Sequence, residues 1–442
     1  HFPMEKGEYS KRISELEESM DFQLDLLQKQ AVEEALTKGL VVVTGGPGTG
    51  KTTTINLMIR CFEMEDMEIV LAAPTGRAAK RMTEATGYEA KTIHRLLEVS
   101  GGIEEGSNSH FEKNEENPIE ADAVILDEMS MVDIHLMYSL LKAIVPGTRL
   151  ILVGDSNQLP SVGPGNVLKD IIDSEAFSVV RLSKIYRQAE SSHIVLNAHK
   201  INAGELITLN NKNKDFFFFE KKDVRSVMGA LVYLVKTRLP EYIGTSPFEI
   251  QVLTPMRKGE LGVEHLNEVL QYYLNPAADS KKEKEGRTSV FREGDKVMQI
   301  KNNYKLEWKI TNDKGFSIEE GLGVFNGDMG IIKQINTYSE RITVVFDENR
   351  EVEYPFSNLD ELELAYAITI HKSQGSEYPA VVLPLLSGPP ILCNRNLLYT
   401  AITRAQKCVA IVGRQSMVEQ MIHNETEQKR YSGLNDCLKD GL

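Results

Sequence analysis

Apolar and polar positions alternate along the first third of this chain in a way that predicts both strands and helices. Short apolar runs predict strands at 40–44, 68–73, 123–126 and 150–153. After Lys51, four apolar residues recur at helical spacing: Ile55, Met58, Ile59 and Phe62. Strands that alternate with helices predict a parallel sheet that is covered on both faces.

A second region of alternating strands and helices begins near residue 248. It predicts a strand at 249–254, a helix at 263–274, and later strands at 365–370, 380–386 and 409–412. The phenylalanine run 216–219 is interpreted as a buried strand, and the polar stretch 275–287 as a linker.

Residues 288–356 have a short, strand-like periodicity with a turn signal at Asn326-Gly327 and a β-rich run at 342–346. This pattern predicts a small β-barrel inserted into the second region. A polar insertion at 99–120, rich in Gly, Ser, Asn and Glu, interrupts the first region. An insertion of that length inside a domain is either a functional loop or disordered.

The composition is that of a globular protein, because 41% of the 442 residues are hydrophobic and 26% are charged. The net charge of −14 argues against a histone-like basic surface, although a local groove of Lys and Arg is still compatible with nucleic-acid binding. No apolar run approaches the ~20 residues that span a bilayer, so no membrane partner is expected. Four scattered cysteines without metal-ligand spacing fit a reducing cytoplasm.

The strongest chemical signal is the sequence GGPGTGKT at 45–52, which follows a predicted strand and precedes a predicted helix. Its glycines allow backbone N–H groups to surround phosphate oxygens, and the helix N-terminus favours the same negative charge. Lys51 is expected to reach the β- and γ-phosphates of ATP, and the Thr52 hydroxyl to bind Mg²⁺.

Two further polar groups follow predicted strands. Asp127 is expected to hold the same Mg²⁺, and Glu128 to polarise the attacking water, although an acidic pair can also cap a helix. Gln158, within GDSNQLP at 154–160, can contact the γ-phosphate and the water, or belong to a simple cap and turn.

The order of motifs resembles that of superfamily 1 helicases, and the second half resembles the RecD-type members of branch 1B. The motifs are the phosphate loop, APTGR (73–77), DEMS (127–130), GDSNQLP (154–160), YRQ (186–188), LTPMR (253–257), HKSQGSE (371–377) and YTAITRA (399–405). The resemblance covers roughly residues 24–413.

The resemblance implies an α/β fold with two RecA-like P-loop NTPase domains and an SH3-like β insertion in the second. The implied boundaries are 1–187 for the first domain, 188–287 with 357–442 for the second, and 288–356 for the insertion. It also implies that Gln28 reads adenine, that Gln158 senses the γ-phosphate, and that Arg187 and Arg404 reach ATP from the second domain. Nucleotide contacts are expected from Gln28, Gly45, Gly46, Pro47, Gly48, Thr49, Gly50, Lys51, Thr52, Thr53, Gly375 and Glu377.

By the same resemblance, single-stranded DNA, offered as a 5′-tailed duplex, is the expected partner. Hydroxyls, helix N-termini and a few cations can hold phosphates without reading bases. The candidate contacts are Pro74, Thr75, Arg77 and His94 in the first domain, and Thr254, Arg257, Lys258, Thr369, His371 and Lys372 in the second.

The insertion 99–120 occupies the place of the family's strand-separating pin, and its acidic character leaves a pin and a mobile loop as equal alternatives. Longer family members carry an N-terminal extension, and this chain, which begins at His1, is expected to be a truncated piece or a shorter relative. No carboxylate cluster suited to two-metal DNA cleavage is seen beyond the ATP site, so no nuclease activity is expected.

We therefore expect an ATP-dependent DNA helicase that moves 5′→3′. It is expected to act in DNA repair or recombination, with protein partners that the sequence does not identify. One alternative is a translocating motor module that needs partner subunits to unwind. Another is a nucleotide-dependent switch that binds a protein partner, and an RNA-directed motor is a further possibility.

Overall fold

The computed structural model describes residues 6–20, 23–98, 111–312, 316–426 and 430–441, and it divides the chain into two compact units. The first unit comprises His1–Val195 and Gln428–Leu442, and the second comprises Leu196–Glu427. The division falls within a helix, α9 (His193–Asn202).

The first unit is built on a parallel sheet of six strands in the order β3-β2-β4-β5-β1-β6. The strands are β1 (Leu40–Gly45), β2 (Ile69–Ala73), β3 (Ala90–Thr92), β4 (Ala123–Leu126), β5 (Arg149–Gly154) and β6 (Ser178–Leu182). The helices are α1 (Lys6–Met20), α2 (Leu26–Thr37), α3 (Lys51–Glu63), α4 (Gly76–Thr86), α5 (Ile93–Leu96), α6 (Ile134–Ala143), α7 (Val167–Ser174), α8 (Arg187–Glu190) and α15 (Leu434–Asp440). The four predicted strands and the helix after Lys51 are confirmed.

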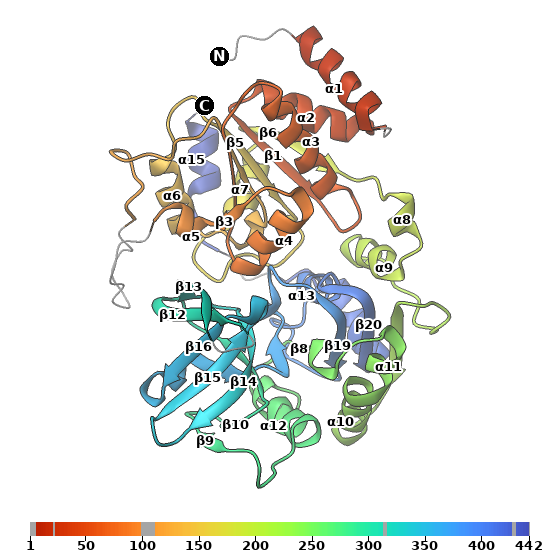
Figure 1. Ribbon diagram of the computed structural model, residues 1–442. Helices are drawn as coiled ribbons and strands as arrows, with labels where there is room; N and C mark the ends of the chain where they lie inside the picture. The colour runs from red at the N-terminus through yellow and green to blue at the C-terminus, as the bar shows by residue number, and fades with distance from the viewer. Residues whose placement is uncertain (1–5, 21–22, 99–110, 313–315, 427–429, 442) are drawn as a thin grey trace. The chain divides into compact units, whose positions relative to one another are not determined.

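Alternation along β1 explains why this sheet is covered on both faces (Figure 1). Val41 and Val43 pack with residues of α2 and α3, whereas Val42 packs with residues of α6 and α7. Successive side chains of a strand point to opposite faces, so a continuous apolar run requires a helical layer on each side.

The second unit contains a five-stranded parallel sheet in the order β18-β8-β19-β20-β7. Its strands are β7 (Phe216–Glu220), β8 (Ile250–Thr254), β18 (Ala367–Thr369), β19 (Tyr378–Leu385) and β20 (Ala405–Gly413). Its helices include α10 (Val224–Tyr233), α11 (Leu239–Ile243), α12 (Val263–Leu274), α13 (Arg395–Ile402) and α14 (Gln415–His423). Phe216 and Phe218 are buried in β7, which confirms the buried strand.

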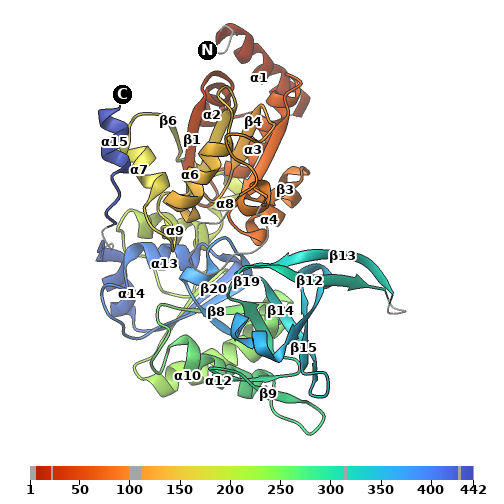
Figure 2. The same cartoon turned by 90° about the vertical axis from the view of Figure 1, so that its left-hand side faces the viewer.

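The inserted region forms an antiparallel sheet of seven strands in the order β13-β12-β16-β15-β14-β11-β17. They are β11 (Lys296–Gln299), β12 (Asn303–Thr311), β13 (Ser317–Val324), β14 (Met329–Asn336), β15 (Arg341–Phe346), β16 (Glu351–Pro355) and β17 (Leu362–Leu364). Figure 2 shows β12 and β13 as a long two-stranded ribbon. The insertion therefore ends later than the predicted residue 356, because β17 pairs with β11.

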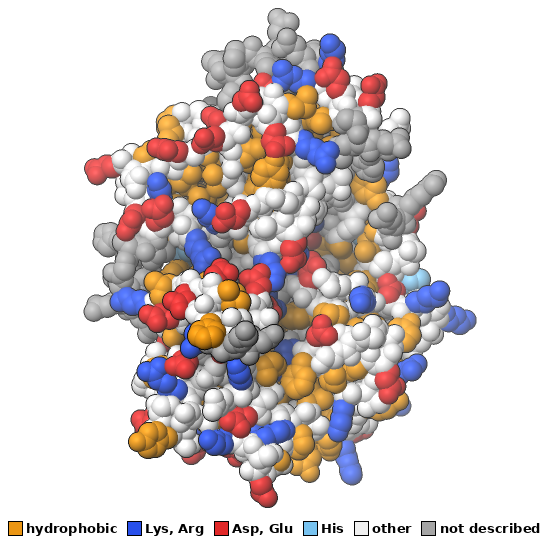
Figure 3. Space-filling model, viewed as in Figure 1, with side chains coloured by type: hydrophobic (Ala, Val, Ile, Leu, Met, Phe, Trp, Pro, Cys, Tyr) orange, Lys and Arg blue, Asp and Glu red, His pale blue; other side chains and the backbone are white. Residues whose placement is uncertain are grey.

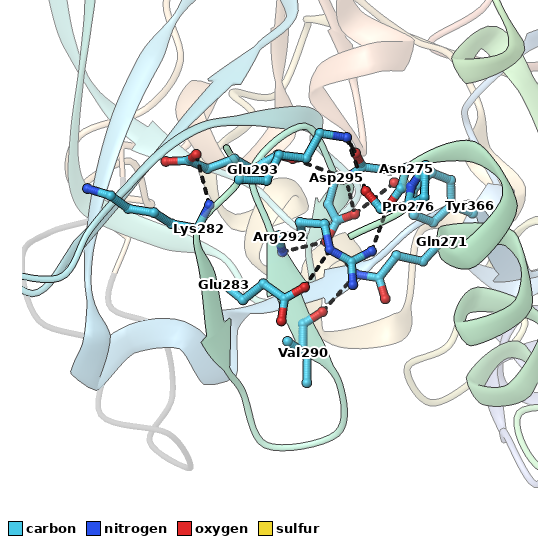
Figure 4. Close-up of polar contacts among 11 residues, drawn as sticks. Gln271, Asn275, Pro276, Lys282, Glu283, Val290, Arg292, Glu293, Asp295 and Tyr366 are labelled. Atoms are coloured by element: carbon cyan, nitrogen blue, oxygen red, sulfur yellow. Dashed lines mark hydrogen bonds and ion pairs between the residues drawn. The ribbon is translucent and has the colours of Figure 1, made fainter. Parts of the chain in front are cut away.

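A buried carboxylate joins this insertion to the rest of the second unit (Figure 4). Asp295 accepts hydrogen bonds from Gln271 Nε2 and Asn275 Nδ2 of the α12 end, both at 2.7 Å, and from the Tyr366 hydroxyl at 2.8 Å. The Arg292 backbone N–H donates to it at 2.6 Å. Burial raises the pKa of Asp295, although the hydrogen bonds lower it in part.

Two predicted boundaries differ from the structure. The supposed linker 275–287 contains β9 (Glu283–Glu285), which pairs with β10 (Val290–Arg292). The segment 428–442, predicted to end the second domain, belongs to the first unit because Leu434 and Leu438 pack into its core. In the polar insertion, residues 99–110 lie outside the described residues, and within 111–120 Ile119 forms an isolated β-bridge with Ile144.

Acidic and basic side chains are interspersed on the face shown in Figure 3. Within the described ranges, no helix is both long and apolar enough to cross a membrane.

Candidate nucleotide site and nucleic-acid contacts

The phosphate loop connects β1 to α3, and two of its glycines have left-handed backbone angles. Gly48 has φ +73° and Gly50 has φ +79°, a region that glycine adopts without strain. A Cβ on Gly45 would lie 2.5 Å from Thr49 Oγ1, and that hydroxyl donates to Gly46 O at 2.7 Å. The loop is therefore a tight cradle that glycine alone can form at these positions.

The polar groups of this cradle are available at the start of α3. Lys51 Nζ donates to Gly45 O at 2.5 Å and to Gly46 O at 3.1 Å, so the ammonium lies against its own loop. Thr52 is exposed, and Thr53 is half-buried. No side chain caps the helix at Gly50, which leaves its first N–H groups suited to an anion.

The acidic pair follows β4, at the same edge of the sheet. Asp127 Oδ1 accepts from the Glu128 backbone N–H at 2.7 Å, and Glu128 itself has φ +56°. Burial and the neighbouring charge of Glu128 raise the pKa of Asp127, while the charges of Arg81 and Lys51 oppose that shift. Lys51 is thus close enough to act electrostatically on Asp127.

Glu128 forms an ion pair with Arg81 of α4, which the sequence analysis did not assign to the site. Glu128 is 8% exposed, so this is a largely buried carboxylate with a cationic partner. Nothing in the local sequence pairs position 81 with position 128, because the contact depends on β2 and β4 being neighbours.

Gln158 lies in the loop after β5, and β5 is located between β1 and β4. The sheet order therefore places this loop between the phosphate loop and the acidic pair. Gln158 is 9% exposed, and its Oε1, like the buried Ser130 Oγ, has no hydrogen-bond partner among the described residues. Buried polar atoms without partners are costly, so these two fit a site that a bound polar group completes. The glycine cradle and the donor set fit a nucleotide with Mg²⁺.

Gln28 is fully buried beneath the phosphate loop. Its backbone N–H donates to Asp25 Oδ1 at 2.9 Å and its Oε1 accepts from the Asp25 N–H at 3.4 Å, which forms a capping box on α2. Its Nε2 lies 3.5 Å from Gly50 O. Asp25 also accepts from the Tyr186 hydroxyl at 2.7 Å. The D-x-x-Q pattern at 25–28 was a sequence signal for this box that the sequence analysis did not use.

Arg187 begins α8 within the first unit, in agreement with the predicted domain bounds 1–187, whereas the resemblance implied that it reaches ATP from the second domain. The segment around it packs on the phosphate loop. The Tyr186 N–H donates to Gly48 O at 3.2 Å, and a Cβ on Gly48 would lie 2.6 Å from Ala189 Cβ. The Arg187 side chain lies outside the described atoms.

In the second unit, Arg404 is 2% exposed, and its Nη1 donates to Ser376 O at 3.2 Å. Its Nε has no partner among the described residues. Gly375 has φ +72°, and Glu377 is exposed and accepts from Gln406 Nε2 at 3.3 Å. The structure thus places Arg404 beside the 375–377 motif.

Of the nucleic-acid candidates in the first unit, Pro74, Thr75 and Arg77 lie together at the start of α4. All three are partly exposed, and Thr75 caps the helix by accepting from the Ala78 N–H at 3.2 Å. His94 lies on α5, where its ring is 6.1 Å from that of Phe111 and burial lowers its pKa.

In the second unit, one candidate lies inside the protein. Thr254 is fully buried, and its hydroxyl donates to Leu261 O at 2.7 Å, so it shapes the loop that follows β8. The neighbouring Lys258 and His371 are exposed.

Arg257 and Lys372 are both associated with Glu363. Arg257 is hydrogen-bonded to Glu363. Burial lowers the pKa of Lys372, and the negative charge of Glu363 opposes that shift. Lys372 Nζ also donates to Asn326 Oδ1 at 2.9 Å. Thr369 is half-buried and accepts from the Lys372 N–H at 3.3 Å. Four of the predicted contacts therefore lie on the segments that follow β8 and β18, which are neighbouring strands.

The described residues form a glycine cradle, an acidic pair and a glutamine loop, all after the ends of neighbouring strands in one parallel sheet. A second parallel-sheet unit follows in the same chain. Together these features define a P-loop NTPase core with two parallel-sheet units. Three family descriptions match: "AAA domain" at residues 28–164, "ATP-dependent RecD-like DNA helicase SH3 domain" at 266–346, and "UvrD-like helicase C-terminal domain" at 364–412.

The chain is 38% identical over 379 residues to the "ATP-dependent RecD2 DNA helicase" of Deinococcus radiodurans, covering 86% of this chain and 47% of that protein. It is 31% identical over 445 residues to the "RecBCD enzyme subunit RecD" of Mycolicibacterium smegmatis, covering 93% and 74%. The chain belongs to the RecD family. It spans about half the length of the Deinococcus relative.

The crystal structure of Bacteroides Pif1 bound to single-stranded DNA has the same fold. The TM-score is 0.51 at 20% identity, and the match covers 90% of this chain and 94% of that chain.

Proposed function

We propose that this chain is the ATP-driven motor of a DNA helicase, translocating on single-stranded DNA and separating duplex strands. The observation that carries the proposal is the convergence of Lys51, Asp127 and Gln158 at the ends of β1, β4 and β5, which are adjacent in one sheet. Such a convergence supports one site for phosphate binding, metal binding and γ-phosphate sensing.

In this proposal, residues 45–53 hold the phosphates, and Thr52 and Asp127 hold Mg²⁺, which neutralises developing charge on the phosphate oxygens when it is bound. Glu128 orients and polarises the attacking water, and its ion pair with Arg81 holds the carboxylate in place. Gln158 fits the role of the γ-phosphate sensor because its Oε1 is buried without a partner. Gln28, Arg187, Arg404, Gly375 and Glu377 keep the nucleotide roles that the family resemblance implies.

The proposed DNA contacts are exposed or partly exposed residues at the ends of strands or on the segments that follow them. Pro74, Thr75, Arg77 and His94 supply them in the first unit, and Arg257, Lys258, Thr369, His371 and Lys372 in the second. Because these groups contact phosphates, binding should not depend on base sequence. The 5′→3′ direction, a role in repair or recombination, and the absence of nuclease activity are parts of the same proposal. So is a cytoplasmic location, which rests on four free cysteines.

The test is ATP hydrolysis by the purified chain with and without single-stranded DNA. Wild-type turnover should rise strongly with DNA. Lys51→Ala and Glu128→Gln should both lose it while remaining folded, because neither side chain packs in the apolar core. Turnover that persists in Lys51→Ala would show that the phosphate-loop assignment is wrong, and turnover indifferent to DNA would favour the nucleotide-dependent switch.

The second candidate is a motor module that needs partner subunits or further chain to unwind DNA. Two observations favour it: the RecD relatives are subunits of an enzyme, and the chain covers 47% of the RecD2 relative. Strand displacement on 5′-tailed and 3′-tailed duplexes separates the two candidates. DNA-stimulated turnover without displacement of either duplex would establish the module.

A further inference from the structure

The last described segment, residues 430–441, returns to the first unit and binds beside the Gln158 loop. Arg430 Nη1 donates to Gly163 O at 2.5 Å and Gly165 O at 3.0 Å, and lies 3.5 Å from Ser161 Oγ. After Arg430, α15 packs against α7, as Figures 1 and 2 both show. This anchoring is independent of the phosphate loop and of every motif described above.

The loop that Arg430 holds has little structure of its own. Residues 161–165 read Ser-Val-Gly-Pro-Gly, and Gly165 has φ +83°. A Cβ on Gly163 would lie 2.1 Å from Asp133 Oδ2, so the loop passes very close to the start of α6. Within the loop, the Ser161 hydroxyl donates to Gly163 O at 3.1 Å, and from α6 the Ile134 N–H donates to Pro164 O at 3.0 Å.

Ser161 is separated from Gln158 by only Leu159 and Pro160. Pro160 restricts the backbone between them, so the position of 161–165 is transmitted to Gln158. Gln158 Oε1 has no partner of its own among the described residues that could fix the side chain. The shape of the loop is therefore one constraint on where the Gln158 amide points.

We propose that Arg430 is a positioning residue for hydrolysis, which holds loop 161–165 so that Gln158 is fixed at the γ-phosphate position. The inference rests on the proposed function of Gln158. A guanidinium suits this role because it is always charged and presents several donors in a rigid plane, so it can hold more than one carbonyl at once.

Further contacts fasten the segment that carries Arg430. The Ser432 hydroxyl bonds the Asp170 side chain, Asn435 Nδ2 donates to Asp170 O at 3.4 Å, and Leu434 and Leu438 pack against the α7 side of the core. These contacts anchor α15 without touching residues 161–165. A variant at Arg430 can therefore release the loop while α15 stays docked.

The experiment compares Arg430→Ala and Arg430→Lys with Lys439→Ala, a control that removes an exposed cation from the same segment. Arg430→Ala should lower kcat for DNA-stimulated ATP hydrolysis by about 10- to 100-fold, as expected when a reacting group is misplaced. KM for ATP and the affinity for a fluorescent ATP analogue should change less than about twofold, because phosphate binding by Lys51 is intact. Lysine should restore part of kcat, and added guanidinium ion should restore part of it in Arg430→Ala but not in Gln158→Ala.

A second readout does not depend on activity. Hydrogen exchange of the amides at 155–166 should be faster in Arg430→Ala, whereas exchange in α15 should match wild type. Unchanged kcat together with unchanged exchange would overturn the inference. A loss of kcat that parallels a loss of nucleotide affinity or of thermal stability would also overturn it, since that pattern indicates a purely structural role. If the wild-type chain shows no DNA-dependent turnover, the proposed function fails first, and the exchange data still show whether Arg430 orders the loop.

Discussion

At the scale of single residues, the site depends on side chains whose partners come from distant parts of the sequence. Glu128 is paired with Arg81, and Tyr186 bonds Asp25, which caps the helix that carries Gln28. These contacts orient groups that the motifs identify by type alone. In the proposed function, the motif residues are the groups that act on the nucleotide. The residues that contact them fix the orientation of their side chains.

Arg81→Ala tests whether the ion pair with Glu128 matters for turnover. We expect kcat for ATP hydrolysis to fall roughly tenfold, because the carboxylate loses the partner that orients it. Nucleotide affinity should be retained. Lys80→Ala on the same helix is the control, because Lys80 is 4.0 Å from Glu84 in an exposed pair of little energetic weight. Equal activity of the two variants would contradict a role for Arg81.

Gly48→Ala tests whether the segment at Ala189 constrains the phosphate loop. Both Gly48 and Gly87 have left-handed angles, at φ +73° and +76°, but a Cβ on Gly87 meets nothing within 4 Å. Gly87→Ala should therefore cost about 1 kcal/mol of unfolding free energy from backbone strain alone. Gly48→Ala should cost more and also weaken binding of a fluorescent ATP analogue. The packing argument fails if the two variants are equally stable and bind nucleotide equally.

At the scale of elements, the second unit is held together by polar contacts between α12, β18 and the inserted sheet. Asp295, which precedes β11, is fully buried and accepts four hydrogen bonds: from Gln271 of α12, from Asn275 that follows it, from Arg292 of β10 and from Tyr366 just before β18. A carboxylate in this position fixes the insertion relative to α12 only while all its donors are satisfied. The prediction for this scale therefore concerns Asp295.

Asp295→Asn should lower the unfolding free energy of the second unit by about 2–4 kcal/mol at neutral pH, because an amide nitrogen would face existing donors. The raised pKa of Asp295 means that its protonation favours the folded state. The part of the unfolding free energy that comes from this protonation is present at acid pH, and it is lost as pH rises through the raised pKa. The stability difference between wild type and the variant should therefore be largest at acid pH.

Trp308, the single tryptophan of the chain, lies in β12 and reports this unfolding by fluorescence. Exposed Asp279, replaced by Asn, is the control. A difference between wild type and Asp295→Asn that does not vary with pH would show that this carboxylate does not titrate with folding.

At the scale of the whole molecule, the chain builds the first unit from both of its ends. The second unit lies between residues 195 and 428 in the sequence, and residues 430–441 then pack on α7. The first unit therefore lacks part of its packing until residues 430–441 have been made. Because residues 430–441 pack on the first unit, their removal should lower the stability of the first unit and leave that of the second unchanged.

A chain that ends at Glu427 should show a lower unfolding temperature for the first unit, by several degrees. It loses the packing of Leu434 and Leu438, at about 1–2 kcal/mol each, and the hydrogen bonds of Arg430. The unfolding of the second unit, followed by Trp308 fluorescence, should be unchanged. Calorimetry of the full and shortened chains measures both transitions. Equal shifts in the two transitions, or none, would contradict this division of the chain.

The sequence by itself determined the two parallel-sheet regions, the phosphate loop, the acidic pair and the family. These signals are local: a strand, a turn and a helix N-terminus are adjacent in the chain, so periodicity and motif spacing reveal them. Only the tertiary structure decided which distant residues support the site. Arg81 meets Glu128 because β2 pairs with β4, and Arg430 reaches Gly163 because the chain returns to the first unit. Thr254 matched a motif yet is buried, because the loop after β8 folds back over its hydroxyl. Burial and contacts across a sheet depend on strand order, which the spacing of residues along the chain does not encode.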